Sequence, residues 1–226
     1  LAAAVPVDGG WRVLSGNEIG WLLAHRALTT TSGDDRLVST SIVSSDLLSA
    51  MAAHHGVTAT RTLTGFKWIV NAGLAEAERK GLRFIFGYEE ALGYTIGSLV
   101  RDKDGISAAL CFSELLAGRK KKGITVLEHL EAIYRQHGLY LTAQRSLALT
   151  ESAADEPTLA DKLRKARPTA IAGRRVEIWT DLGQSKRDYA DARDSEQVDL
   201  PQSEVLVYHL AAKADEDDES PARIVV

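Results

Sequence analysis

The chain has 226 residues and a formal charge of −4, from 27 Lys and Arg against 31 Asp and Glu. This length allows one large domain or two modest ones. The acidic run 215–219 alone contributes −5, so the rest of the chain carries about +1, and this balance excludes a general electrostatic case for nucleic-acid binding. No apolar run approaches the roughly 20 residues that cross a bilayer, so no membrane partner is expected.

The ends of the chain and its cysteine content indicate where the protein works. The chain begins with Leu1 instead of Met, and its first residues lack the basic segment of a signal peptide. We therefore expect the sequence to begin inside a longer protein. Cys111 is the single cysteine and lies in an apolar helical run, which favours a buried, inert thiol. These features predict a cytoplasmic location.

Strand-like and helix-like segments alternate along the first two thirds of the chain. A strand over 11–14 leads into an amphipathic helix over 19–27, for which Asn17 is the expected N-cap. The segments that follow read as strand, helix, strand, helix and strand, over 37–43, 47–54, 57–63, 67–79 and 82–86. Helices over 106–116 and 125–137 complete the series. This order predicts an α/β fold, a three-layer α/β/α sandwich with a mixed sheet.

A polar interruption over 150–156 predicts a domain boundary, which gives domains 1–149 and 150–226. Beyond it the pattern indicates a helix over 158–166 and strands over 176–180 and 205–210. The last residues, 223–226, resemble a core-facing strand that the chain end cuts short. We therefore expect a smaller α+β domain that is incomplete at its C-terminal end.

The adjacent carboxylates of Glu89 and Glu90 lie in segment 87–94, GYEEALGY, just after the predicted strand 82–86. Open α/β sheets place ligand sites in loops at such strand ends, and two carboxylates supply up to four acceptor oxygens for hydroxyl groups. Paired Glu residues in a turn are more often solvated surface. A second polar cluster, RDKDG over 101–105, follows closely, although Asp104 also fits a helix cap. Together the clusters predict an anionic ligand with hydroxyls.

Four motifs, in this order and spacing, resemble the α-D-phosphohexomutases, which include phosphoglucomutases and phosphomannomutases. The motifs are GNEIG over 16–20, TGFK over 64–67, EEALG over 89–93 and DKDG over 102–105. In that family they correspond to the start of the third domain, the substrate-specificity loop, the sugar-binding loop and a Lys-Asp-Gly turn. The resemblance implies that the chain is the whole third domain plus most of the fourth of a four-domain enzyme.

The sugar loop departs from the common family pattern. Ala91 stands where many members have Ser, and Tyr88 precedes the first Glu. This variant resembles the branch of phosphopentomutase-like phosphoglucomutases. Losing the hydroxyl removes one hydrogen bond to sugar, so the choice between hexose and pentose phosphate stays open.

The resemblance also implies roles for individual residues. Glu89 and Glu90 would bind sugar hydroxyls, and Lys67 and Lys103 would lie near phosphate or the reacting hydroxyl, with Lys103 as the candidate acid or base. Phe66 fits a core residue at a helix start equally well. The implied substrate-binding residues are Thr64, Gly65, Phe66, Lys67, Glu89, Glu90, Gly93 and Lys103.

By resemblance, the intact enzyme interconverts the 1-phosphate and 6-phosphate of glucose or mannose, or a pentose 1-phosphate and 5-phosphate. It works through a phosphoserine and a bisphosphorylated sugar, which also serves as activator. The phosphoserine and the Mg²⁺ loop belong to the first two domains, so this chain should hold no metal, depend on those N-terminal domains as partners and be inactive alone. The histidines fit structural or surface roles, and no third ligand is spaced near His54 and His55.

Two other classes of function make different demands on the sequence. A non-catalytic sugar-phosphate-binding or regulatory α/β module would be favoured by an open reading frame that begins near Leu1. A fragment of an NAD-dependent oxidoreductase is disfavoured, because no G-x-G-x-x-G follows a predicted strand.

Overall fold

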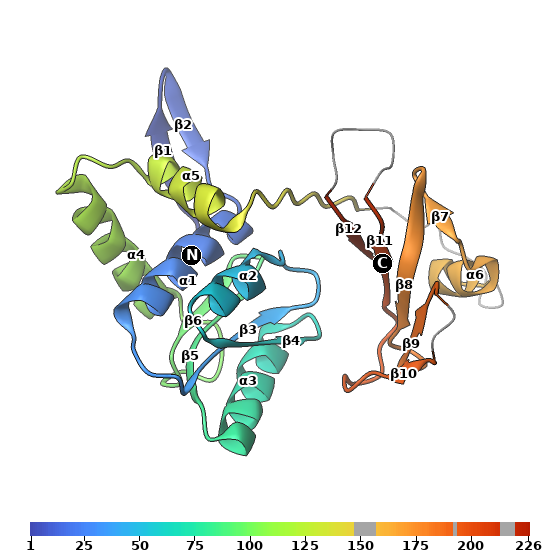
Figure 1. Ribbon diagram of the computed structural model, residues 1–226. Helices are drawn as coiled ribbons and strands as arrows, with labels where there is room; N and C mark the ends of the chain where they lie inside the picture. The colour runs from blue at the N-terminus through green and yellow to red at the C-terminus, as the bar shows by residue number, and fades with distance from the viewer. Residues whose placement is uncertain (147–156, 192–193, 213–219) are drawn as a thin grey trace. The chain divides into compact units, whose positions relative to one another are not determined.

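The computed structural model describes residues 1–146, 157–191, 194–212 and 220–226. They form two compact units, Leu1–Ala143 and Gln144–Val226 (Figure 1). Each unit is described by itself. The predicted boundary between residues 149 and 150 and the acidic run 215–219 lie outside the described residues.

The first unit is built on a four-stranded sheet with the order β4-β3-β5-β6. Strand β3 (Arg36–Ser41) pairs in parallel with both β4 (Thr58–Thr62) and β5 (Arg83–Glu89). Strand β6 (Gly93–Ile96) pairs antiparallel with β5. The predicted mixed sheet is therefore confirmed.

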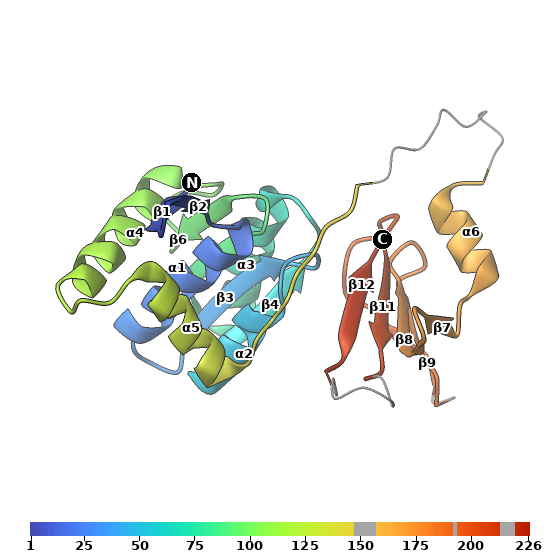
Figure 2. The ribbon, with the colours of Figure 1, turned by 90° about the horizontal axis from the view of Figure 1, so that it is seen from above.

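Helices cover both faces of this sheet. Helix α3 (Phe66–Lys80) lies on one face, and α1 (Gly16–Thr30) and α2 (Leu47–His54) lie on the other (Figure 1). Helix α5 (Val126–His137) packs against α1 and α2, and α4 (Gly105–Lys120) packs against α1 and β6 (Figure 2). This is the predicted α/β/α sandwich.

Strand β5 shows how the core is divided between the two faces. Phe86 and Tyr88 pack into the large hydrophobic cluster that includes the buried side of α1. Phe84 packs with Leu37 and Ala77 on the α3 side. The pairing of β5 with β3 shifts register between Phe84 and Phe86, so these two residues face opposite layers although they are two positions apart.

The prediction that residues 87–94 form a loop is wrong in detail. Strand β5 continues through Glu89, residues 90–92 form a turn, and β6 begins at Gly93, so the segment is a β-hairpin. Tyr88 pairs with Tyr94 across it, and aromatic pairs of this kind stabilise antiparallel strands. Only the tip of the hairpin is free to act as a loop.

Asn17 is not the N-cap of α1. Ser15 holds that position: its hydroxyl accepts from the Glu18 backbone N–H at 3.2 Å, and the Glu18 carboxylate accepts from the Ser15 N–H at 2.8 Å. This capping box satisfies the first helical donors without Asn17. A hairpin of β1 (Ala4–Val7) and β2 (Gly10–Val13) precedes the helix; β2 matches the predicted strand, and β1 was not predicted.

The second unit is an antiparallel sheet with the order β10-β9-β8-β11-β12, to which β7 adds beside β8. Helix α6 begins at a Thr158 capping box, and its Ala160 and Leu163 pack on a cluster that contains Leu206 and Tyr208. The predicted helix and strands of this region are confirmed. The elements are α6 (Leu159–Ala166), β7 (Ala170–Ile171), β8 (Arg174–Asp181), β9 (Lys186–Tyr189), β10 (Glu196–Gln197), β11 (Leu206–Leu210) and β12 (Ala222–Val225).

Within the described ranges, no helix has both the length and the apolar character needed to cross a bilayer. Cys111 is a free, buried thiol, as predicted, and burial raises its pKa.

Candidate functional site

The carboxyl ends of β3, β4 and β5 meet at one edge of the first sheet, because these strands run parallel. Strand β5 ends at Glu89, β3 ends at Ser41, and the segment after β4 leads through Gly65 into α3. Ligand sites in open α/β sheets lie at this edge. The predicted sugar loop and specificity loop are therefore neighbours in space.

Glu89 is buried and joins these two loops. Its Oε1 accepts a hydrogen bond from the Gly65 backbone N–H at 2.9 Å. Gly65 is the N-cap of α3 and has a φ of 112°, a conformation that side chains rarely tolerate. The carboxylate thus lies at a helix N-terminus, where the backbone dipoles favour negative charge.

Lys103 approaches Glu89 from the loop before α4. Its Nζ lies 3.9 Å from Glu89 Oε2, and the side chain is 51% exposed where that of Glu89 is only 6% exposed. The ammonium also lies 5.3 Å from the Phe66 ring centroid. The arrangement puts an accessible cation beside a buried anion, with room for the cation to reach a ligand in solvent.

Phe66 and Gly93 shape the same corner. Phe66 is buried with Ile69 and Val70 in the α3 layer, which supports its interpretation as a core residue at a helix start. A Cβ on Gly93 would lie 2.8 Å from the Phe66 ring and 3.1 Å from Lys103 Cε. A larger residue at position 93 would therefore displace Lys103.

Glu90 is the first residue of the turn after β5 and has different partners. Its Oε2 accepts hydrogen bonds from the hydroxyls of Ser44 at 2.7 Å and Ser41 at 3.1 Å. Its backbone N–H donates to Ser44 Oγ at 3.2 Å. Both serines are buried, and Glu90 is partly exposed. Among the described residues, nothing hydrogen-bonds to Oε1, which leaves that oxygen to accept from a ligand.

The serines were not predicted as site residues: Ser41 was assigned to the strand 37–43, and Ser44 lies in the connection before the helix 47–54. The strand order could have indicated that Ser41 lies near the glutamates. Ser41 ends the strand next to β5, and neighbouring parallel strands end at the same edge.

Thr64 and Lys67, the two remaining predicted residues, make no described contact with the two glutamates. Thr64 and Lys67 are exposed, and the Lys67 Nζ lies 6.0 Å from the Trp68 ring centroid. Within the described part of the chain, no hydrogen bond or ion pair joins Thr64 or Lys67 to the two glutamates. The structure therefore gathers Gly65, Phe66, Glu89, Gly93 and Lys103 at one corner, while Glu90 in the adjacent turn contacts Ser44.

The GNEIG segment packs directly beneath this hairpin. A Cβ on Gly16 would lie 1.7 Å from the Glu90 carbonyl oxygen, and one on Gly20 would lie 2.5 Å from the Tyr88 ring. The Tyr94 hydroxyl donates to the Gly16 carbonyl at 3.0 Å. Glycines four residues apart on one helix face let α1 approach the sugar loop closely.

A family model, phosphoglucomutase/phosphomannomutase alpha/beta/alpha domain III, matches residues 15–136. The match covers more than half of the chain and contains every residue of the site. The chain belongs to the phosphoglucomutase/phosphomannomutase family.

Individual relatives agree with this assignment. A probable phosphomannomutase of Haemophilus influenzae is 34% identical over 212 residues, which are 93% of this chain and 39% of that protein. A probable phosphoribomutase of Schizosaccharomyces pombe is 34% identical over 192 residues, 80% of this chain and 32% of that protein. The chain thus spans 32% and 39% of the length of these two relatives.

A solved structure supports the fold alone. The exocytosis-sensitive phosphoprotein parafusin, a phosphoglucomutase from Paramecium in its open form, aligns with a TM-score of 0.50 at 16% identity. The alignment covers 94% of this chain and 36% of that one.

The phosphoglucomutase/phosphomannomutase domain also holds a histidine group that the sequence did not predict. His137 of α5 lies near His54 and His55, with ring centroids 5.0 Å and 6.3 Å away. Helix α5 brings this third imidazole from a distant part of the sequence, and local spacing around His54 and His55 gives no sign of it. Across the described ranges, no group of three or more His, Cys, Asp or Glu residues is arranged to hold a metal ion.

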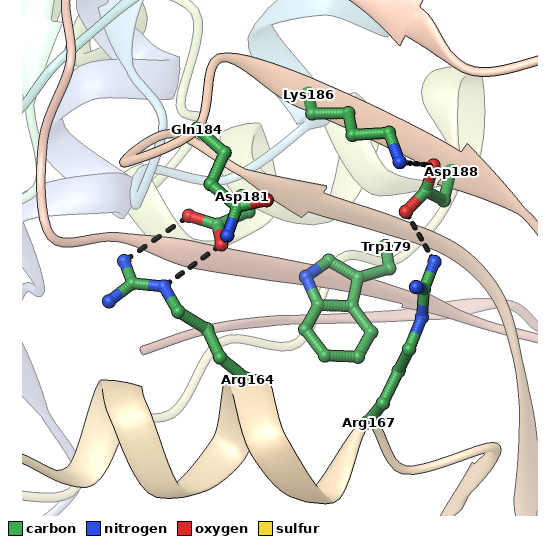
Figure 3. A pocket seen from close by; sticks show the side chains of 7 residues that line it. All are labelled: Arg164, Arg167, Trp179, Asp181, Gln184, Lys186 and Asp188. Atoms are coloured by element: carbon green, nitrogen blue, oxygen red, sulfur yellow. Dashed lines mark hydrogen bonds and ion pairs between the residues drawn. The ribbon is translucent and has the colours of Figure 1, made fainter. Parts of the chain in front are cut away.

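The second unit of this family member has a polar pocket between α6 and β8–β9 (Figure 3). Arg164 donates from Nε to Asp181 at 2.9 Å, Lys186 Nζ lies 3.0 Å from Asp188, and Arg167 also pairs with Asp188. These contacts neutralise the charged groups of the pocket against one another. We assign it a structural role.

Proposed function

We propose that this chain forms the sugar-recognition part of a phosphohexomutase. The full-length enzyme would interconvert the 1-phosphate and 6-phosphate of glucose or mannose, through a phosphoserine and a bisphosphorylated sugar. A pentose 1-phosphate and 5-phosphate are a second candidate pair, supported by the similarity to the probable phosphoribomutase of S. pombe. The similarity to the probable phosphomannomutase of H. influenzae supports mannose phosphate.

The observation that carries the proposal is the placement of two carboxylates and one lysine at the ends of parallel strands. Glu89 is held by a helix N-terminus, and Glu90 is held by two buried serines with Oε1 left over. Charge-assisted acceptors fixed in this way can orient sugar hydroxyls without contacting phosphate. The half-exposed ammonium of Lys103 suits a phosphate group or a reacting hydroxyl.

The chemistry of the proposed reaction requires both groups that orient the sugar and a cation near the phosphate or the reacting hydroxyl. In the first transfer a sugar hydroxyl oxygen bonds to phosphorus while the bond to the serine oxygen breaks, and the hydroxyl proton passes to a base. The second transfer returns the other phosphoryl group to the serine. Phosphoryl transfer depends chiefly on positioning and electrostatics. We propose Lys103 as an acid/base participant and Thr64 and Lys67 as mobile contributors to the specificity loop.

We propose that the full-length enzyme requires Mg²⁺ and a sugar bisphosphate activator. The described residues do not fit a resident metal site, so we propose that the Mg²⁺ ligands and the phosphoserine belong to other domains of the same protein. We propose accordingly that the 226-residue chain alone turns over no sugar phosphate, and that the enzyme works in the cytoplasm.

The test is Glu89→Ala in the full-length protein that contains this chain. We expect kcat/KM for glucose 1-phosphate, mannose 1-phosphate or ribose 1-phosphate, whichever the wild type uses, to fall by about 10²–10³-fold, as for other buried groups that stabilise a transition state. Glu78→Ala, on an exposed position of α3, is the matched control and should leave kcat/KM unchanged. Circular dichroism would show that both variants are folded.

Three outcomes separate the alternatives. A wild-type rate in Glu89→Ala would remove the role assigned to Glu89. Turnover of one of the three substrates selects the sugar. Binding of sugar phosphate without any turnover by the full-length protein would favour a non-catalytic sugar-phosphate-binding module instead.

A further inference from the structure

We propose that Asn17 is a positioning residue whose side chain ties the segment after α5 to the hairpin that carries Glu90. The inference rests on the proposed function, because that function assigns the hairpin to sugar binding. Asn17 does not touch the proposed ligand position; it acts through the residues that hold Glu90.

Asn17 is buried and uses both ends of its amide. Its Oδ1 accepts a hydrogen bond from the Ser45 backbone N–H at 3.1 Å and another from the Tyr88 hydroxyl at 2.9 Å. Its Nδ2 donates to the Thr142 hydroxyl at 3.2 Å. One side chain therefore joins the β3–α2 loop, strand β5 and the segment after α5.

Helix formation does not explain an asparagine here. The cap of α1 is Ser15, and Asn17 lies inside the first turn, where alanine would be the better helix former. Only 6% of Asn17 is exposed, so its amide needs partners within the protein. The three contacts are a sufficient reason for the residue.

Three routes lead from Asn17 to Glu90. Tyr88 lies on β5, two residues before Glu90, and Ser45 adjoins Ser44, whose hydroxyl binds the Glu90 carboxylate. Gly16 adjoins Asn17 in the chain and packs against the Glu90 carbonyl. A shift of Asn17 would therefore move the backbone beneath Glu90 and the serine that fixes its carboxylate.

Two of these contacts last under ordinary solution conditions. Burial raises the pKa of the Tyr88 hydroxyl, so it stays protonated and continues to donate to Asn17. The Ser45 donor is a backbone N–H and does not titrate. By contrast, Thr142 is exposed, and its contact with Asn17 is the one that solvent can compete for. A change in the segment after α5 would thus reach the hairpin through the Asn17 amide.

The first experiment measures steady-state kinetics of Asn17→Ala in the full-length protein. A displaced Glu90 weakens sugar binding in the ground state and in the transition state alike, so we expect KM to rise about tenfold with kcat within threefold of wild type. Asn71→Ala, at an exposed position of α3, is the control and should change neither constant. An unchanged KM in Asn17→Ala would overturn the proposal.

The second experiment needs no turnover and uses the 226-residue chain itself. Amide hydrogen exchange at Ser45 and Glu90 should become about tenfold faster in Asn17→Ala, while the Val70 amide in α3 keeps its rate. Thr142→Val removes only the contact to the segment after α5 and should also speed exchange at Glu90. Unchanged Glu90 exchange in Thr142→Val would show that this segment is not coupled to the hairpin.

The two experiments distinguish a failure of the proposed function from a failure of the role assigned to Asn17. A full-length protein that is inactive on every sugar phosphate contradicts the proposed function, and the exchange rates still decide the role of Asn17. Should Asn17→Ala fail to fold, Tyr88→Phe removes one of the same hydrogen bonds, and its Glu90 exchange decides in its place.

Discussion

Gly16 lies where helix α1 meets the turn between β5 and β6. A Cβ there would lie 1.7 Å from the Glu90 carbonyl oxygen and 2.6 Å from its carbonyl carbon. These are backbone atoms, which cannot swing aside as the end of a flexible side chain does. The glycine is needed for close approach, despite its cost in a helix.

Gly16→Ala should therefore destabilise the chain by about 2 kcal/mol, as overpacking of a tight contact does. Gly118→Ala in α4 is the matched control: a Cβ there meets no atom within 4 Å, and we expect a gain of about 0.5–1 kcal/mol from helix propensity. Urea denaturation of both variants measures the difference. Equal effects of the same sign would contradict the packing argument.

At the scale of elements, a histidine pair joins α1 to α5. His129 Nε2 and His25 Nδ1 lie 3.2 Å apart. Burial, and then the nearby Arg119 charge, lowers the pKa of each from 6.5 to about 4. The folded chain keeps both rings neutral where the unfolded chain protonates them. Their contribution to stability is present above pH 6.5 and is lost as the pH falls from 6.5 toward 4.

We expect the free energy of unfolding to fall by about 1 kcal/mol or more per pH unit between pH 6 and 5 as the unfolded chain takes up protons at these sites. His129→Gln removes one titrating ring while keeping a polar partner for His25, and should make the fall shallower. His209→Gln, in the second unit, is the control. Chemical denaturation at a series of pH values gives the slopes, and identical slopes in wild type and His129→Gln would rule out this pair as the source.

At the scale of the whole molecule, the two units have separate hydrophobic clusters. The cluster around α1, α2, α4 and α5 comes from residues before 144, and the cluster around β8 and β11 comes from residues after 157. Each unit therefore has the apolar core that independent folding requires.

Residues 1–143 should fold without the rest of the chain. We expect the isolated piece to unfold cooperatively on heating, within a few degrees of the matching transition in the 226-residue chain. A shorter piece, 1–138, lacks Thr142 and Tyr140, which packs against the first core, and should lose about 1–2 kcal/mol. An unfolded 1–143 piece would show that the two units depend on each other.

Local patterns were sufficient for most of the elements of the first unit. Helix α2 coincides with the predicted range 47–54, because an apolar run there lies between a polar cap region and Gly56. The position of Glu89 at a strand end followed from the local pattern, and the grouping of Gly65 and Lys103 with it was implied by the resemblance of the motifs.

Features that depend on distant pairing were not predictable from the sequence. The extension of β5 to Glu89 requires pairing with β6, and this pairing leaves Glu89 on the strand and Glu90 in the turn. The contact of Ser44 with Glu90 and the approach of His137 to His54 join residues 46 and 83 positions apart. The helical and strand periodicities of the sequence carry no information about such contacts.

The separate partners of Glu89 and Glu90 have a consequence for how such a site can diversify. The α3 side is encoded by the segments around Gly65 and Lys103, and the α2 side by the segment around Ser41 and Ser44. Substitutions in one set leave the hydrogen bonds of the other intact. The residues around Glu89 and those around Glu90 can therefore change separately in evolution. A new ligand can be accommodated by one set while the other set keeps its contacts.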